Sequence, residues 1–238
     1  MSDRSQAGGL RVRSLADVHL ADRLTGPGCP VCGARARAVA RYLDGWLGES
    51  VNDVTLRAEL DRARGLCGDH TGALLAAERR GAGGRLASAI LLDAILRVRA
   101  AELATARTAR GRGRGRAYAA AARPPACLVC ATEAAAEASA VTGIAGYLDD
   151  ADWVRAAGAA AFCLAHLVAL LGVADGPGAA AVAAEQAARV DAVRALLTAY
   201  GMNAAFDRRH LQRPEEAAAV DAAAQLLGAP GAETPSRG

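Results

Sequence analysis

The sequence contains no lysine and very few aromatic residues. All 28 basic residues are arginine, and phenylalanine, tryptophan and tyrosine together make up 3% of the 238 residues. β-Branched residues are also sparse, whereas alanine and leucine are abundant, and this composition favours helix over sheet. Because alanine buries little area, a core of alanine and leucine gains less transfer free energy than one rich in phenylalanine and isoleucine. We therefore expect an all-α protein in which bound metals add to the stability.

Acidic residues are missing from the stretch that carries much of the positive charge. The formal net charge is +3, and removing six arginines of this stretch from the 28 leaves 22 basic residues against 25 acidic ones. Any affinity for polyanions would therefore reside here. Arginine alternates with glycine before Pro124 and Pro125, which predicts a flexible linker over residues 107–126. We favour a solvated linker over a nucleic-acid-binding segment, because Tyr118 is its single aromatic residue. The six residues are Arg107, Arg110, Arg112, Arg114, Arg116 and Arg123.

The sequence also lacks the features of an exported or membrane-spanning chain. Residues 1–9 are polar and show no charged-then-apolar export signal, so we predict a cytoplasmic protein. Residues 156–174 carry no charge and approach the length that crosses a bilayer. They consist mostly of alanine and glycine, however, with Cys163 and His166 near the middle, so we expect a buried helix and no contact with a membrane.

All six cysteines and two of the four histidines fall into a repeated pattern of Cys-x-x-Cys followed by Cys-x-x-His. In a cytosolic protein such cysteines are more often metal ligands or redox groups than structural disulfides. Three cysteines and one histidine supply the four donors that tetrahedral zinc prefers. We therefore predict two zinc ions, each bound by consecutive pairs: Cys29, Cys32, Cys67 and His70 in one site, and Cys127, Cys130, Cys163 and His166 in the other.

The spacing of these pairs predicts an internal duplication. Cys127 follows Cys29 by 98 residues and Cys163 follows Cys67 by 96, so two units of like topology are expected. Pro30 and Gly33 favour a tight turn in the first Cys-x-x-Cys, whereas the second lacks such residues. The predicted organisation is two pseudo-repeated metal-stabilised helical units, over 14–106 and 127–228, with a C-terminal helix in the second. The segments 1–13 and 229–238 are predicted to be disordered.

Other assignments of these residues and their neighbours stay open. A fourth protein ligand leaves no position for water, which favours a structural ion over a reactive one. The same ligands could hold an iron–sulfur cluster or act as redox thiols. The carboxylates of Glu49 and Asp53, in a polar cluster with Asn52, could perform acid–base chemistry, but a helix cap at Asn52 or Asp53 explains this cluster more simply. We assign no catalytic residue and no organic cofactor, and we expect His19 and His210 to be ordinary surface histidines and Trp46 and Trp153 to be core anchors.

The motifs together resemble a prokaryotic family of uncharacterised proteins known only as a domain of unknown function. The similarity rests on the two ligand sets, on the Glu49-x-Val51-Asn52-Asp53 segment and on a late Phe206-Asp207-x-Arg209 box, and it covers residues 15–228. It supports the eight ligands and implies no activity. We therefore predict a zinc-binding bacterial protein that acts as an interaction or adaptor module for an unknown protein partner, and we do not expect an enzyme. The alternatives are an iron–sulfur or thiol redox protein, and a nucleic-acid-associated protein acting through the Arg/Gly linker.

Overall fold

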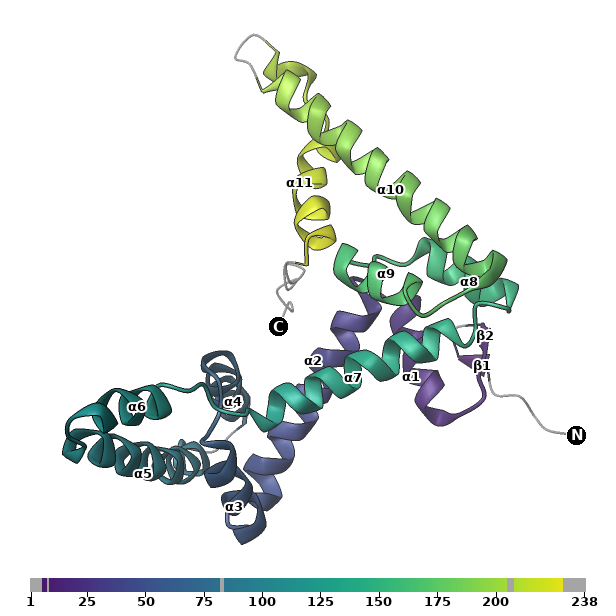
Figure 1. Ribbon diagram of the computed structural model, residues 1–238. Helices are drawn as coiled ribbons and strands as arrows, with labels where there is room; N and C mark the ends of the chain where they lie inside the picture. The colour runs from purple at the N-terminus through teal and green to yellow at the C-terminus, as the bar shows by residue number, and fades with distance from the viewer. Residues whose placement is uncertain (1–5, 8, 82–83, 205–207, 229–238) are drawn as a thin grey trace, which may run out of the picture. The chain divides into compact units, whose positions relative to one another are not determined.

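The computed structural model describes residues 6–7, 9–81, 84–204 and 208–228, and this part of the chain is almost entirely helical (Figure 1). The all-α prediction is thus confirmed. Phe206 and Asp207 of the late sequence box, and the predicted disordered tail, lie outside the described residues. The helices are α1 (Leu15–Leu24), α2 (Pro30–Gly45), α3 (Val54–Ala63), α4 (Gly68–Arg80), α5 (Leu86–Thr108), α6 (Arg112–Ala121), α7 (Leu128–Ala145), α8 (Ala151–Ala159), α9 (Leu164–Leu171), α10 (Gly176–Asn203) and α11 (Pro214–Leu226).

Local signals in the sequence explain where several helices begin. Ser14 caps α1, where its side chain accepts a hydrogen bond from the backbone N–H of Asp17. Asp53 caps α3 by accepting from the N–H of Thr55 at 2.7 Å. A short π-helix, η1 (Trp46–Ser50), precedes this cap. The position of Asp53 therefore supports the capping interpretation of the Glu49–Asp53 cluster.

The chain divides into two compact units whose bounds differ from the predicted ones. Unit 1 comprises residues 1–34 and 137–238, and unit 2 comprises residues 35–136. Both boundaries lie within helices, since α2 contains residues 34 and 35 and α7 contains residues 136 and 137. The chain therefore passes from one unit to the other through two helices and not through the Arg/Gly segment, which lies wholly in unit 2.

The core of unit 1 combines the start of the chain with its second half. Side chains from α1, the first turn of α2, the second half of α7 and α8 to α10 form one hydrophobic cluster. Trp153 is fully buried, stacks on Tyr147 with ring centroids 4.1 Å apart, and donates its indole N–H to the carbonyl of Arg11. Leu10 and Val12, which lie in the segment predicted to be disordered, are buried here beside the two-residue antiparallel strands β1 (Gln6–Ala7) and β2 (Leu10–Arg11).

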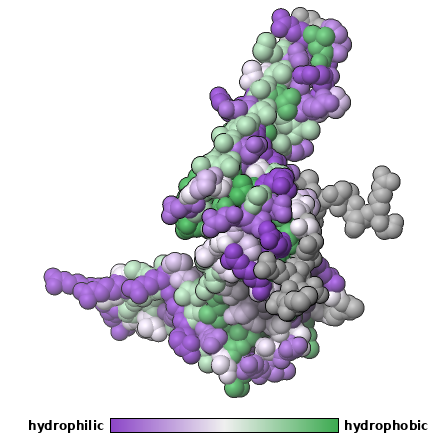
Figure 2. All heavy atoms as spheres, turned by 90° about the vertical axis from the view of Figure 1, so that its right-hand side faces the viewer, coloured by the Kyte–Doolittle hydropathy of each residue, from purple (hydrophilic) through white to green (hydrophobic). Residues whose placement is uncertain are grey.

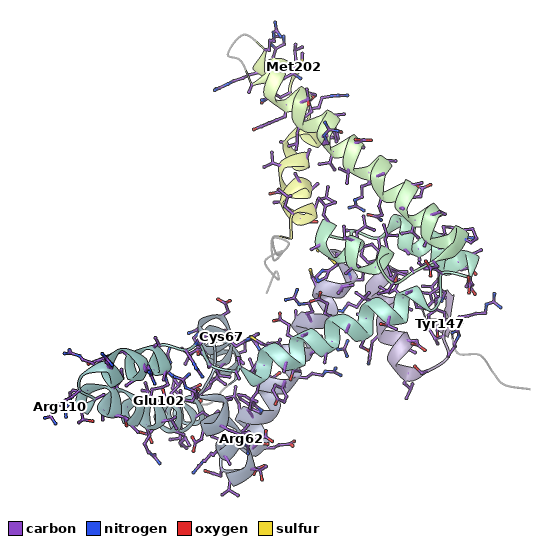
Figure 3. All side chains as sticks on the ribbon, viewed as in Figure 1. Arg62, Cys67, Glu102, Arg110, Tyr147 and Met202 are labelled. Carbon is purple, nitrogen blue, oxygen red and sulfur yellow. The ribbon has the colours of Figure 1, made fainter. Side chains whose placement is uncertain are left out.

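Two helices extend unit 1 beyond this cluster. The 28-residue helix α10 packs against α8 near its start and against α11 further along. A 3₁₀ turn, η2 (Arg209–Leu211), precedes α11. Hydrophilic and hydrophobic residues are mixed on the elongated part of the molecule in Figure 2, and Met202 near the end of α10 is exposed (Figure 3).

The core of unit 2 is built from α2 to α5 and the start of α7. Leu43, Leu60, Leu74 and Leu91 are almost fully buried, and Trp46 packs beside them with its ring near that of Tyr42. The burial of Trp46 and of Trp153 in unit 1 agrees with their prediction as core anchors. The helix α6 lies within the stretch predicted to be a flexible linker and packs against α5.

One described helix, α7, is long and apolar enough to cross a membrane by length and composition. It contains Cys130, Glu133 and Glu137, which belong to the clusters described below, and its two ends contribute to the cores of unit 2 and unit 1. Only 22% of the helix is buried, and many of its apolar residues are exposed or half-buried alanines. The uncharged segment 156–174 is not one helix, because α8 ends at Ala159 and α9 begins at Leu164.

Candidate metal centres

The eight predicted ligands come together in two four-residue clusters, but their pairing differs from the predicted one. Within each cluster, one ligand atom from each residue lies within 4.8 Å of all the others. The first Cys-x-x-Cys meets the second Cys-x-x-His, and the second Cys-x-x-Cys meets the first Cys-x-x-His. The unit 1 cluster is Cys29, Cys32, Cys163 and His166, and the unit 2 cluster is Cys67, His70, Cys127 and Cys130.

The predicted pairing of consecutive motifs is therefore wrong, although each cluster still contains three cysteines and one histidine. The motif halves are chemically interchangeable, so ligand chemistry does not select between the two pairings. Chain entropy favours the pairing of consecutive motifs only weakly. The 131 residues between Cys32 and Cys163 are about two doublings of the predicted separation of about 35 residues, and closing the longer loop costs about 1.2 kcal/mol more. Packing of the helices, which the local sequence does not reveal, decides the pairing.

All four ligand pairs occupy the same place on a helix. Cys67 and Cys163 are the N-cap residues of α4 and α9, and their histidines follow three residues later in the first turn. Cys29 and Cys127 immediately precede α2 and α7, where their carbonyls accept the first helical hydrogen bonds, from Gly33 and Ala131. Side chains at the N-cap and three residues later lie close together, which is the geometry of a capping box.

This placement also corrects the expectation of a tight Cys-x-x-Cys turn. Pro30 is the first residue of α2, where proline is favoured. Gly33 lies within the helix, and a Cβ there would come within 2.9 Å of the Arg23 guanidinium. The second motif needs neither residue, since Leu128 and Ala131 are ordinary helix formers. Each cluster thus unites two helix N-termini, whose partial positive charge favours thiolates.

The distances within the clusters fit a single tetrahedral ion. Zinc bonds of about 2.3 Å to sulfur and 2.0–2.1 Å to nitrogen place tetrahedral sulfurs about 3.8 Å apart and sulfur about 3.6 Å from nitrogen. In unit 1 the Sγ atoms of Cys32 and Cys163 are 3.9 Å apart, and the three sulfurs lie 3.0–3.5 Å from Nδ1 of His166.

The unit 2 cluster has the same dimensions. The Sγ atoms of Cys67 and Cys130 are 3.7 Å apart, and its three sulfurs lie 3.2–3.6 Å from Nδ1 of His70. Figure 3 shows Cys67 at the start of α4. Sulfurs this far apart are not joined by a disulfide, and all six cysteines are free.

Each histidine turns its second nitrogen toward a glutamate on α7. Nε2 of His70 lies 3.6 Å from Glu133, and Nε2 of His166 lies 3.5 Å from Glu137. A carboxylate at this position favours the tautomer with the proton on Nε2, which leaves Nδ1 to bind a metal. The two glutamates are not among the ligands and neighbours predicted from the sequence. Their signal is the helical spacing from Cys130, because residues three and seven positions later share its face.

The clusters differ in exposure, and the pKa of at least one thiol in each is raised, whereas the pKa of Cys127 is lowered because its desolvation by burial is outweighed by hydrogen bonds. Burial, with the neighbouring Cys29 and Cys163, raises the pKa of the Cys32 thiol to about 12. Desolvation and the sulfurs of Cys67 and Cys127 raise the pKa of Cys130 to about 12, although this residue is the exposed ligand of its cluster. Metal binding must therefore displace protons from these thiols, so affinity falls as the pH falls.

The remaining candidates of the sequence analysis lie away from the clusters. His19 and His210 are both exposed, as expected of surface histidines. Asn52 accepts a hydrogen bond from Arg57 beside the cap of α3, and Glu49 belongs to η1.

Comparison with known proteins identifies relatives of unknown function. The chain matches a family of unknown function, DUF6062, over residues 16–175, a range that contains all eight ligands. No curated protein and no solved structure matches the chain.

Proposed function

We propose that this chain, which belongs to the DUF6062 family, is a cytoplasmic bacterial protein in which two structural zinc ions hold helices that bind a protein partner. The observation that carries this proposal is that each compact unit contains one complete Cys₃His cluster. Four protein donors close the coordination sphere of zinc and leave no position for a water nucleophile. The metal would therefore stabilise the fold and would take no part in a reaction.

Zinc fits these clusters better than an iron–sulfur cluster. The ligands of an iron–sulfur cluster bind different iron atoms and so lie further apart than the donors to one ion. Here all donor atoms of a cluster lie within 4.8 Å of one another, and the sulfur–sulfur distances of 3.7 and 3.9 Å match a single tetrahedral centre.

A thiol redox function has less support than zinc binding. Reactive cysteines have a lowered pKa, because the thiolate is the nucleophile. The pKa of Cys127 is lowered, but the pKa values of Cys32 and Cys130 are raised to about 12, so in the metal-free chain one thiol of each Cys-x-x-Cys stays protonated at neutral pH.

The proposed role as an interaction module rests on the helix that carries the unit 1 ligands Cys163 and His166. On α9, Leu164 is 37% exposed and Val168 is 68% exposed, and their spacing of four residues places them on one face. The metal would fix the first turn of α9 and thereby the position of this apolar face. The internal duplication stays a prediction, supported by the like position of the four ligand pairs at helix N-termini.

Metal analysis of the purified protein tests the central proposal. We expect two zinc ions per chain, and we expect a strong chelator to reduce the helix content measured by circular dichroism, because metal binding is coupled to folding. Iron with absorption near 400 nm would favour the alternative cluster. Metal-free protein with full helix content would refute the structural role.

Cross-linking in the native host tests the adaptor role. Val168→Glu places a charge on the apolar face of α9, whereas Leu103→Glu places one at a residue of α5 that is 57% exposed. We expect the first variant to lose a cross-linked partner that the wild type and the control retain. If Val168→Glu retains every partner of the wild type, the proposed surface is wrong.

A further inference from the structure

Six exposed arginines around α6 have no acidic partner among the described residues. They are the arginines of the Arg/Gly segment, and we call them the arginine surface: Arg107, Arg110, Arg112, Arg114, Arg116 and Arg123. Residues 103–132, all of them described, contain no aspartate or glutamate. Some exposed arginines elsewhere pair with carboxylates, as Arg97 does with Asp93 and Arg194 with Asp191. The arginine surface is thus an uncompensated concentration of positive charge.

Much of the segment that carries these arginines forms the helix α6, and Arg64, the C-cap residue of α3, holds the end of this helix. Arg64 donates from its guanidinium to the carbonyls of Ala120, Ala121 and Arg123 at 2.9–3.2 Å. These bonds satisfy carbonyls at the end of α6 that have no partner within the helix. Arg64 has a φ of 62°, the only positive φ of a non-glycine residue in the described ranges. Its left-handed conformation carries strain that the bonds to α6 offset.

The nearest carboxylate is already neutralised. Glu102 of α5 accepts hydrogen bonds from Arg64 and, at 2.7 Å, from Arg99. Hydrogen bonds from Arg64 therefore hold the pKa of Glu102 below its usual value of 4.5. Glu102 thus anchors α6 and leaves no negative charge to balance the arginine surface.

Within α6 the charges repel one another. Arg112 and Arg116 are four residues apart and so lie on one side of the helix with Cβ atoms about 5–6 Å apart, a like-charge arrangement that destabilises a helix. Gly113 and Gly115 lower its intrinsic stability further. A bound polyanion would relieve this repulsion, since phosphates would lie between the guanidinium groups.

The composition of the surface selects among polyanions. A helix that binds membranes needs a face of large apolar residues, whereas the residues between these arginines are glycine, alanine, Thr108 and Tyr118. Tyr118 is 42% exposed, and the Arg114 guanidinium lies 5.8 Å from its ring centre. An aromatic ring beside arginines can stack on a base of a nucleic-acid strand. Figure 3 shows Arg110 at the α5–α6 connection, directed away from both helices.

We propose that the arginine surface binds the phosphate backbone of single-stranded nucleic acid without sequence preference. The segment contains no asparagine, glutamine or carboxylate, the side chains that recognise the edges of adenine and cytosine. Binding would depend on phosphate contacts and on stacking at Tyr118. This function is separate from metal binding, because none of the eight ligands belongs to the surface.

Fluorescence anisotropy with a labelled single-stranded oligonucleotide of mixed sequence tests the proposal. The full metal-loaded chain should bind with an affinity that falls steeply with salt, with a slope of about 0.7 for each phosphate contact on logarithmic axes. At about 0.1 M salt the same relation predicts roughly a fivefold loss of affinity for each contact removed. The variant with Arg110, Arg112, Arg114 and Arg116 changed to alanine should therefore lose affinity several-hundredfold and show a shallower salt slope.

A second variant controls for net charge. Changing Arg11, Arg97, Arg155 and Arg194 to alanine removes the same charge from arginines that form exposed ion pairs. Its affinity should stay within a few-fold of the wild type. Alanine is the best helix former, so the α6 variant should retain its helix content by circular dichroism. The proposal would be overturned if both variants lost affinity equally or if the wild type did not bind the oligonucleotide at low salt. It would also be overturned if the wild type bound anionic phosphatidylserine vesicles and not the oligonucleotide.

Discussion

The crossed pairing of the ligands can be tested by counting metal ions in double variants. In the structure Cys29 and Cys163 belong to the same cluster, whereas Cys29 and Cys67 belong to different clusters. The variant Cys29→Ser/Cys163→Ser should therefore damage one site and retain one zinc ion. The variant Cys29→Ser/Cys67→Ser should damage both sites and retain none. Pairing of consecutive motifs predicts the reverse result for both variants.

Stoichiometry is a better readout than melting temperature for this question. The unit 1 cluster joins residues up to 131 positions apart (Cys32 and Cys163), and the unit 2 cluster joins residues 63 apart (Cys67 and Cys130). Loss of either cross-link therefore changes the chain entropy of the unfolded state by amounts that differ by only about 0.6 kcal/mol. Zinc binding itself contributes about 10–16 kcal/mol in small zinc domains. The loss of even one ion should thus dominate the stability, and the melting temperature would not report which of the two sites was lost.

The assay is elemental analysis of the two variants after gel filtration, with cobalt absorption as a second measurement. The variant Cys29→Ser/Cys32→Ser serves as a control, because it removes two ligands of one site under either pairing and should retain one ion. The pairing seen in the structure would be refuted if Cys29→Ser/Cys67→Ser retained one ion and Cys29→Ser/Cys163→Ser retained none.

Three further predictions concern residues around the clusters and the core. Glu137→Gln should weaken zinc binding in unit 1 about 10–100-fold and leave the unit 2 ion in place, measured by competition with a chromogenic chelator. Because the pKa of Glu102 is lowered in the folded state, its contribution is present above pH 4.5 and is lost as the pH falls through the lowered value. Glu102→Gln should therefore reduce stability at neutral pH and flatten its acid dependence in urea titrations, and an unchanged acid limb would contradict this. Trp153→Phe should cost about 1–3 kcal/mol in the same titrations, since it leaves the carbonyl of Arg11 without its donor, and a neutral effect would show that water replaces this bond.

Much of the helical fold could be predicted from the sequence because its local signals agree with its packing. Composition gave the all-α class, and Ser14 and Asp53 mark the starts of α1 and α3. The eight ligands could also be identified from the sequence, because no cysteine lies outside the repeated motifs. Helix boundaries and ligand types depend on neighbours in the sequence, which are visible without a structure.

The partners of those elements could not be predicted in the same way. The Arg/Gly segment has the composition of a flexible linker, yet Arg64 and the packing against α5 hold part of it as α6. Leu10 and Val12 look like part of a polar terminus, but they are buried in the core of unit 1. In each case a contact with a distant residue overrides the local preference.

The crossed pairing also orders the events of biosynthesis. His70 and Cys67 leave the ribosome long before Cys163 and His166, so Cys29 and Cys32 first encounter a complete but incorrect set of partners. At about 5–20 residues per second, the 131 residues between Cys32 and Cys163 take roughly 7–26 s to translate. During that interval a zinc ion bound by consecutive motifs would be a kinetic trap. The nascent chain must therefore either exchange its ligands after Cys127 and Cys130 emerge or acquire its first ion only then.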